Sequence, residues 1–183
     1  MAKVICITGK ARAGKTTFCE VAKKELETKY GKKVIVFHFA DFLKFIAAKW
    51  FGYDGDKTKP EMRSLLQKLG TDVFRKNNPG CWVDMADAFV KGLGDEVDYV
   101  LVGDCRFINE AEWADAVIRV LRPGFDNGLT PEQKAHPSEA EQDHIEADLF
   151  LMNDRTLKDY ENKVRSVCRS IADDNFFDIV SLI

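Results

Sequence analysis

Short apolar runs and longer amphipathic segments alternate along this chain of 183 residues. Apolar runs of strand length, rich in β-branched residues, recur, and helical patterns stand between most of them. The five runs span residues 4–8, 34–39, 99–102, 116–121 and 148–152. Strands that alternate with helices are typical of a parallel sheet covered by helices. The pattern therefore predicts an α/β fold with a mostly parallel five-stranded sheet.

Residues 41–95 interrupt this alternation, because they are far more than one crossover helix between two strands requires. We predict a helical insertion here. Asp41 is a plausible N-cap for its first helix, and 58–61 (Thr-Lys-Pro-Glu) has the capping-box pattern of a second. The apolar positions with helical spacing are Leu43, Ile46, Ala47, Trp50 and Phe51, then Met62, Leu65, Leu66, Leu69 and Val73, then Trp82, Met85, Ala86, Phe89, Val90 and Leu93. Arg63 and Gln67 fall outside the second stripe, four residues apart on one face, where they are free to point at a ligand.

Residues 122–143 form the second interruption and are rich in proline and glycine. Long segments of this kind in compact domains are often functional, so we interpret this one as a lid, with plain disorder as the alternative. A closing helix with apolar positions from Leu157 to Ile171 follows, and 176–183 form an apolar tail expected to pack on the fold. The whole chain, 1–183, is predicted to be one domain.

The charge and the cysteine content argue against several classes of protein. The formal net charge is -3, so no overall basic field favours a nucleic acid polymer or an anionic membrane as partner. The cysteines, five in number and without a C-x-x-C pair, look like small core residues and argue against disulfides or a zinc site. Because no signal-peptide pattern or membrane-spanning stretch is found, we expect a cytoplasmic protein.

A complete G-x-x-x-x-G-K-[ST] phosphate-binding loop, residues 9–16, directly follows the first apolar run and precedes a helical pattern. The backbone N–H groups of such a loop surround phosphates, and the helix N-terminus adds partial positive charge. Lys15 is expected to reach the β- and γ-phosphates, and Thr16 to ligate Mg²⁺. The predicted nucleotide-binding residues of the loop are Gly9, Ala11, Arg12, Ala13, Gly14, Lys15, Thr16 and Thr17.

Phosphoryl transfer requires cations and a metal ligand near the phosphates more than it requires covalent chemistry. Asp104 follows a buried strand, where ligands sit in open α/β sheets, and is our second Mg²⁺ ligand; a helix cap is the alternative. Arg106 could clamp a phosphate through two donors, or form a surface ion pair with Glu110. Arg122, which leaves a strand end at the start of the lid, is a further catalytic candidate.

Two charged residues near the second strand could contact a substrate. Asp41 could hold a substrate hydroxyl or orient a cation, or serve only as a helix cap. Lys44, one turn later, could bind phosphate or be merely solvated. His136, in the lid segment, is left outside the catalytic set, because direct transfer between phosphates needs no side-chain nucleophile.

Several segments together resemble the bacteriophage deoxynucleoside monophosphate kinases. Besides the phosphate loop they are Phe39-Ala40-Asp41-Phe42-Leu43-Lys44, Arg63-x-x-x-Gln67-x-x-Gly70-Thr71-Asp72-x-x-Arg75, Asp104-x-Arg106-Phe107-x-Asn109-Glu110 and His136-Pro137-Ser138-Glu139. The last two segments, in this order, are more specific than the phosphate loop, which marks a superfamily only.

The resemblance implies an adenylate-kinase-like, three-layer P-loop fold in which ATP and Mg²⁺ serve to phosphorylate a deoxynucleoside monophosphate. It makes 41–95 the monophosphate-binding region and 122–143 the lid. It places Arg63, Gln67, Arg75 and Arg106 on the acceptor side, and Asn153 and Arg155 near the ATP base. It also implies a host cytoplasm if the chain is phage-encoded. Which bases are accepted and whether a homodimer forms stay open.

Other functions are less consistent with the sequence. A GTP-driven switch needs D-x-x-G and N-K-x-D elements, and a nucleic-acid-dependent ATPase needs a basic stripe with interleaved aromatics; neither pattern stands where it would be needed. The nearer alternative is a kinase of the same fold that phosphorylates another phosphorylated acceptor, such as phosphomevalonate or dephospho-coenzyme A.

Overall fold

The computed structural model describes residues 1–56, 59–126, 128, 137–173 and 176, and of Pro60, Arg63 and Ser138 it describes only the backbone. The chain divides into two compact units. The sheet unit comprises Met1–Phe37 and Leu93–Ile183, and the helical unit comprises His38–Gly92. No helix among the described residues is long and apolar enough to cross a membrane.

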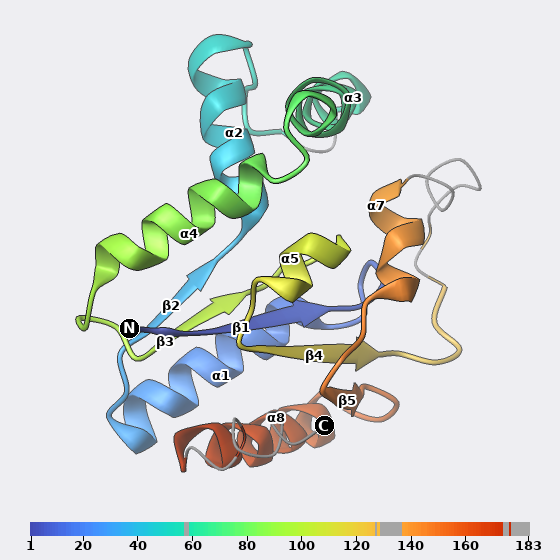
Figure 1. Cartoon of the computed structure of the whole chain (residues 1–183). Coiled ribbons are helices and arrows are strands. Elements are labelled where there is room, and N and C mark those ends of the chain that lie inside the picture. Colours follow the sequence, from blue (N-terminus) through green and yellow to red (C-terminus); the bar gives the residue numbers. More distant parts are fainter. Residues whose placement is uncertain (57–58, 127, 129–136, 174–175, 177–183) are drawn as a thin grey trace. The chain divides into compact units, whose positions relative to one another are not determined.

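The sheet unit is built on five parallel strands (Figure 1), as the apolar runs predict. They are β1 (Lys3–Thr8), β2 (Val34–Phe37), β3 (Tyr99–Val102), β4 (Ala116–Leu121) and β5 (Leu149–Met152). Their order is β2-β3-β1-β4-β5, so β1 lies at the centre with Ile5 opposite both Leu101 and Ala116. The connection from β1 leads to β2 at one edge, whereas the connection from β3 leads past β1 to β4 on its other side. Ligands bind at the carboxyl ends of strands where the order reverses in this way.

Helices cover both faces of this sheet (Figure 1). Helices α1 (Lys15–Tyr30) and α8 (Leu157–Ala172) lie side by side on one face, and α5 (Ile108–Glu112) lies over the other. Helix α1 ends at Gly31, whose φ of 63° is the left-handed conformation common after a helix C-terminus. All five cysteines are buried and free, as expected of core residues. Of the apolar tail only Phe176 is described, and it is buried; 177–183 lie outside the described residues.

The first helix of the helical unit begins earlier than predicted. The second strand ends at Phe37, and α2 (Phe39–Trp50) follows with His38 as its N-cap. Asp41 is therefore not the N-cap but stands in the first turn, where its carboxylate accepts the His38 backbone N–H at 3.2 Å. An acidic group in the first turn is favourable because it satisfies a free N–H and faces the positive end of the helix dipole.

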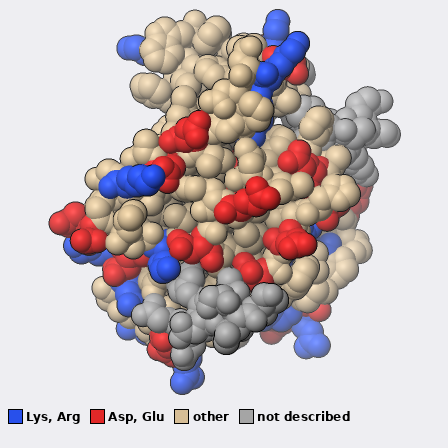
Figure 2. Space-filling model, in the orientation of Figure 1, with Lys and Arg blue, Asp and Glu red and all other residues tan. Residues whose placement is uncertain are grey.

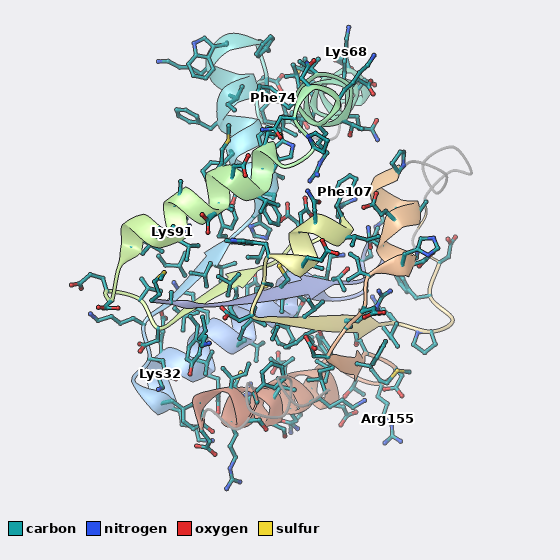
Figure 3. The ribbon with its side chains drawn as sticks, viewed as in Figure 1. Lys32, Lys68, Phe74, Lys91, Phe107 and Arg155 are labelled. Atoms are coloured by element: carbon teal, nitrogen blue, oxygen red, sulfur yellow. The ribbon has the colours of Figure 1, made fainter. Side chains whose placement is uncertain are left out.

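A π-helical segment changes the expected apolar stripe. Helix α3 (Pro60–Gln67), with Lys59 as its N-cap, runs directly into η1 (Lys68–Arg75), and α4 (Cys81–Leu93) follows. Because a π-helix bonds residue i to i+5, the spacing of the stripe is broken, and Phe74 packs inward while Val73 is exposed. Figure 3 shows Phe74 among the helices of this unit and Lys68 pointing away from them. Thr58, the predicted capping residue, lies outside the described residues.

Candidate active site

The phosphate-binding loop connects β1 to α1 and depends on its two glycines. Gly9 has a φ of 135°, and a Cβ there would lie 2.4 Å from the Val120 carbonyl oxygen. Gly14 has a φ of 118°, and a Cβ there would lie 2.7 Å from the Asn153 side-chain nitrogen. Both positions require a conformation and a close approach that only glycine allows.

Lys15 lies in the loop with its ammonium group turned toward backbone oxygens. Its Nζ donates to the carbonyls of Gly9 at 2.5 Å and Lys10 at 3.0 Å. Burial, and after it the Arg106 charge, lower the pKa of Lys15 from 10.5 to about 8, while Glu139 and Asp104 oppose the shift. These carbonyls hold the ammonium at the place where phosphate oxygens are expected.

The far side of the loop is fixed from the end of the sheet and from α8. Asn153, which follows β5, donates through Nδ2 to the Ala13 carbonyl at 2.8 Å. The Tyr160 hydroxyl donates to the Gly14 carbonyl at 3.1 Å, and burial raises the pKa of this phenol well above its usual value. Tyr160 is thus a neutral donor that orients the loop.

A cavity of about 340 Å³ opens beside this loop within the sheet unit. Its lining residues are Arg12, Gly14, Lys15, Thr16, Thr17, Arg122, Asn153, Arg155, Leu157 and Tyr160. It brings together most of the residues predicted to contact ATP, although they stand more than 100 positions apart in the sequence. Gly9, Ala11 and Ala13 do not line it. Figure 3 shows Arg155 extending outward from the loop after β5.

Sequence reasoning missed two cavity residues, Leu157 and Tyr160. Both were assigned only to the apolar stripe of the closing helix, and Tyr160 is indeed buried. Leu157 is instead 63% exposed at the helix start, where it lines the cavity. The position of Leu157 in the sequence could have indicated this role, since it stands two residues after Arg155, which was predicted to lie near the ATP base.

The carboxyl end of β3 carries Asp104 and Arg106. Asp104 is half-buried and does not cap α5, whose N-cap is Phe107, seen at the start of that helix in Figure 3. The side chain of Arg106 does not pair with Glu110, which instead accepts the Arg106 backbone N–H at 2.7 Å. Arg106 Nη1 lies 2.6 Å from Glu139 Oε1. The helix-cap alternative for Asp104 and the Glu110 ion-pair alternative for Arg106 are therefore wrong, and the metal and phosphate roles of the two residues stay predictions.

Arg122 and the start of the predicted lid lie beside the phosphate loop. Arg122 Nη1 donates to the Arg12 carbonyl at 3.3 Å, and its guanidinium stacks on the Phe125 ring, 3.8 Å from the ring centroid. The middle of the segment, including His136, lies outside the described residues.

The helical unit holds the other predicted substrate residues. Lys44 Nζ lies 2.9 Å from Asp41 Oδ1, and His38 Nδ1 lies 3.3 Å from Asp41 Oδ2. Partial burial acts to raise the pKa of Asp41, but Lys44 and His38 outweigh it and the pKa lies below its usual value. Gln67 is half-buried in α3, and Arg75 Nη1 donates to the Pro79 carbonyl at 3.2 Å. Arg63 lies in α3, and its side chain is not described.

The described residues are compatible with a metal carried by a nucleotide. Among them, no group of three or more His, Cys, Asp or Glu side chains is arranged to hold a metal ion. Mg²⁺ typically keeps several waters and is bound through one or two protein ligands and substrate phosphates. Thr16, exposed at the start of α1, and Asp104, whose charge acts on Lys15, are the residues here that fit such a role.

The surface of the sheet unit carries little positive charge on the face shown in Figure 2. Over α5 and its surroundings, Asp and Glu side chains predominate over Lys and Arg.

Comparison with solved structures indicates the fold. The chain is similar to dephospho-CoA kinase from Campylobacter jejuni, with 17% identity, a TM-score of 0.61 and coverage of 96% of this chain and 100% of that one. It is also similar to the APS kinase CysC of Mycobacterium tuberculosis, solved in complex with AMPPNP and APS, with 13% identity, a TM-score of 0.51 and coverage of 93% and 97%. The α/β fold predicted from the sequence, that of the P-loop kinases, is confirmed.

Comparison of sequences indicates the family. The curated deoxynucleotide monophosphate kinase of Escherichia phage RB69 is 33% identical over 114 residues, which are 59% of this chain and 45% of that protein. The matched segment thus spans less than half of the relative's length. Residues 54–164, more than half of the chain, match the family model described as deoxynucleotide monophosphate kinase. The chain therefore belongs to the deoxynucleotide monophosphate kinase family.

Proposed function

We propose that this protein transfers the γ-phosphoryl group of ATP to a deoxynucleoside monophosphate, giving ADP and the deoxynucleoside diphosphate. The observation that carries the proposal is the family match over 54–164, a range that excludes the phosphate loop. The loop at 9–16, recognised independently, supplies the phosphate-binding half of the same reaction.

ATP is proposed to occupy the cavity beside the phosphate loop. Its volume of about 340 Å³ is in the range of small-molecule sites. The backbone N–H groups at the start of α1 would surround the phosphates, and the Lys15 ammonium would contact the β- and γ-phosphates. Asn153, Arg155 and Leu157, at the other end of the lining, would border the base. Mg²⁺, held by Thr16 and Asp104, would neutralise charge on the phosphates.

We propose six residues for binding the acceptor. Asp41, Lys44, Arg63, Gln67 and Arg75 would contribute from the helical unit, and Arg106 from the carboxyl end of β3. Arg63 and Arg106 are our candidates for the acceptor phosphate, since a guanidinium can bind two phosphate oxygens at once. The reaction needs no protein nucleophile when the acceptor phosphate oxygen attacks directly.

We propose that 41–95 and 122–143 belong to one kinase domain, 1–183, as monophosphate-binding region and lid, and that they close when both substrates are bound. Closure would exclude water, which is a competing acceptor for the phosphoryl group. Because ATP and deoxynucleoside monophosphates are cytoplasmic metabolites, we infer a cytoplasmic enzyme, in a host cell if the chain is phage-encoded. Amide hydrogen exchange should show more protection in both segments with a two-headed adenosine–deoxynucleoside polyphosphate than with ATP alone.

An ADP-release assay over a panel of acceptors tests the proposed reaction. The panel holds dTMP, dGMP, dCMP, dAMP and the corresponding ribonucleotides, with dephospho-coenzyme A and phosphomevalonate as acceptors of the alternative class. We expect ADP formation that depends on at least one deoxynucleoside monophosphate. Turnover of only dephospho-coenzyme A or phosphomevalonate would replace the proposal with the alternative kinase.

A further inference from the structure

Two carboxylates are buried among the described residues of the sheet unit, and they are used differently. Glu110 is 2% exposed, and its Oε2 accepts the backbone N–H groups of Arg106 at 2.7 Å and Phe107 at 3.2 Å. Glu110 thus stabilises the start of α5. Glu139 is 7% exposed, and its Oε1 contacts the guanidinium of Arg106 instead. Glu139 thus contacts Arg106, which we propose to bind the acceptor phosphate.

The Glu139 carboxylate is bound through only one of its oxygens. Oε1 lies 2.6 Å from Arg106 Nη1, whereas the buried Oε2 has no hydrogen-bond partner in the described structure. A buried acceptor without a partner costs about 1–3 kcal/mol, so such an arrangement is unfavourable for stability alone. Groups of this kind in native proteins call for a functional explanation.

The geometry of the pair leaves Arg106 able to bind a ligand. A guanidinium has five N–H donors, and Glu139 contacts it through Nη1 alone among the described contacts. The Arg106 side chain is 37% exposed, whereas that of Glu139 is only 9% exposed. The acid therefore lies behind the cation, and the remaining donors of the guanidinium can face an incoming phosphate.

Glu139 is also tied to the phosphate loop. Lys10, the second residue of that loop, donates through Nζ to the Glu139 carbonyl at 3.0 Å and lies 2.7 Å from Asp143 Oδ1. Glu139 lies in the short helical stretch formed by α7 (Pro137–Ala140) and η2 (Glu141–His144), and Arg119 of β4 donates to the Gln142 carbonyl of this stretch at 2.8 Å. The carboxylate thus has a fixed place relative to Lys15.

We propose that Glu139 is a positioning residue that holds the Arg106 guanidinium near Lys15, so that a phosphate meets two cations already in place. The inference rests on the proposed function, because a positioned Arg106 is useful only if the protein binds a phosphate there. The Arg106 and Lys15 charges repel each other, and the Glu139 carboxylate reduces that repulsion because its charge acts on Lys15 in the opposite sense. An arginine held in advance also loses less side-chain entropy when the substrate binds.

The titration of Lys15 in the ligand-free protein reports on this arrangement. The charges that act on its ammonium are Arg106, which lowers the pKa, and Glu139, Asp104 and Cys19, which raise it; Lys10, in contact with the Glu139 carbonyl, is the other nearby cation. Removing the Glu139 charge should therefore lower the pKa of Lys15 below about 8, and removing the Arg106 charge should raise it. NMR of the labelled lysine side chains measures both changes without substrate.

A double-mutant cycle tests whether Glu139 acts through Arg106. We expect Glu139→Gln to reduce kcat/KM for the acceptor about tenfold, mainly through KM, and to have no further effect in an Arg106→Ala background. Glu141→Gln is the matched control, because Glu141 stands in the same short stretch but accepts only the Ile108 backbone N–H at 3.0 Å in the described structure. This control should leave kcat/KM and the Lys15 titration unchanged.

Several results would overturn the inference. Equal losses from Glu139→Gln with and without Arg106, or an unchanged Lys15 titration, would show that Glu139 does not act on these cations. Should Glu139→Gln fail to fold, Glu139→Asp keeps the charge and shortens the reach; we expect it to keep the Lys15 titration and to lose acceptor kcat/KM, and full activity would contradict us. If no deoxynucleoside monophosphate is phosphorylated, the proposed function fails, while the Lys15 titration still decides the arrangement of charges.

Discussion

The sheet unit and the helical unit hold their charged side chains in different ways. In the sheet unit, Lys15 donates to two loop carbonyls and Arg106 is paired with a buried acid. In the helical unit, Lys44 and His38 pair with Asp41, whose side chain is 50% exposed.

This difference indicates a division of labour between the units. Both cations of the sheet unit have fixed partners before any ligand arrives, and such preorganisation lowers the cost of binding charged groups. Because the Lys44–Asp41 pair is more exposed to solvent than Glu139, we expect the helical unit to adapt more when a substrate binds. The predictions below test this comparison, beginning with the largest expected effect.

Replacing Lys15 should lower activity and raise the stability of the sheet unit. We expect Lys15→Met to reduce kcat at least ~100-fold, because its ammonium supports charge on the transferred phosphoryl group. The same change should raise the free energy of unfolding at pH 7 by roughly 1–2 kcal/mol, because it removes a charge that burial disfavours. Steady-state kinetics and urea denaturation measure the two effects. Near-normal turnover in this variant would remove the phosphate loop from the proposed site.

A methyl group at Gly9 should show how tightly the phosphate loop is built. Gly9→Ala places a Cβ against the Val120 carbonyl in a left-handed backbone conformation, so we expect a loss of about 3 kcal/mol in stability and weaker ATP binding. Gly92→Ala is the control from the helical unit, since nothing lies within 4 Å of its added Cβ. Gly92 lies in the last turn of α4, so that change should stabilise by no more than about 0.5 kcal/mol. Similar losses at both glycines would contradict the comparison.

The KM for the acceptor should respond differently to single substitutions in the two units. Arg106→Ala should raise the acceptor KM about tenfold or more and leave the KM for ATP nearly unchanged, because a charged phosphate contact is lost. Arg63→Ala is expected to behave in the same way. Gln67→Ala, which removes a neutral contact, should raise the acceptor KM only about threefold. Loss of ATP affinity with an unchanged acceptor KM in either arginine variant would reverse our assignment of the two sites.

The pH dependence should show opposite trends for activity and stability. Lys15 has a pKa of about 8 in the ligand-free protein, so kcat/KM for ATP should fall as the pH rises through 8 and the ammonium is lost. The pKa is lower in the folded chain than the ordinary value of 10.5, so the unfolded chain binds more protons between these values. The contribution of Lys15 to stability should therefore rise with pH from about 8 to 10.5 and be absent in Lys15→Met. A stability that falls over this window in wild type alone would give the opposite sign.

Local patterns allowed most of the sheet unit to be predicted. Four of the five strands were located to within one residue because a central parallel strand is an apolar run buried on both faces, as β1 is. The phosphate loop was likewise readable, since its glycines and lysine stand at fixed spacing. The helical unit was less predictable. There, the N-cap of α2 is His38 rather than Asp41, so the helix begins at Phe39. The π-helical segment η1 also places Phe74 in the apolar cluster, where the helical spacing had predicted Val73.

The sequence by itself determined the order of strands and helices, the phosphate loop and the residue types that can meet an anion. These properties depend on contacts between neighbours in the chain or on a repeating spacing. Only the tertiary structure decided that Arg106 pairs with Glu139 rather than with Glu110, and that Leu157 lines a cavity rather than the core. Glu110 is nearer in sequence, but its carboxylate is already used by two backbone N–H groups at the start of α5. The partner of a charged side chain is set by which groups remain available once the backbone is satisfied, and that depends on the whole fold.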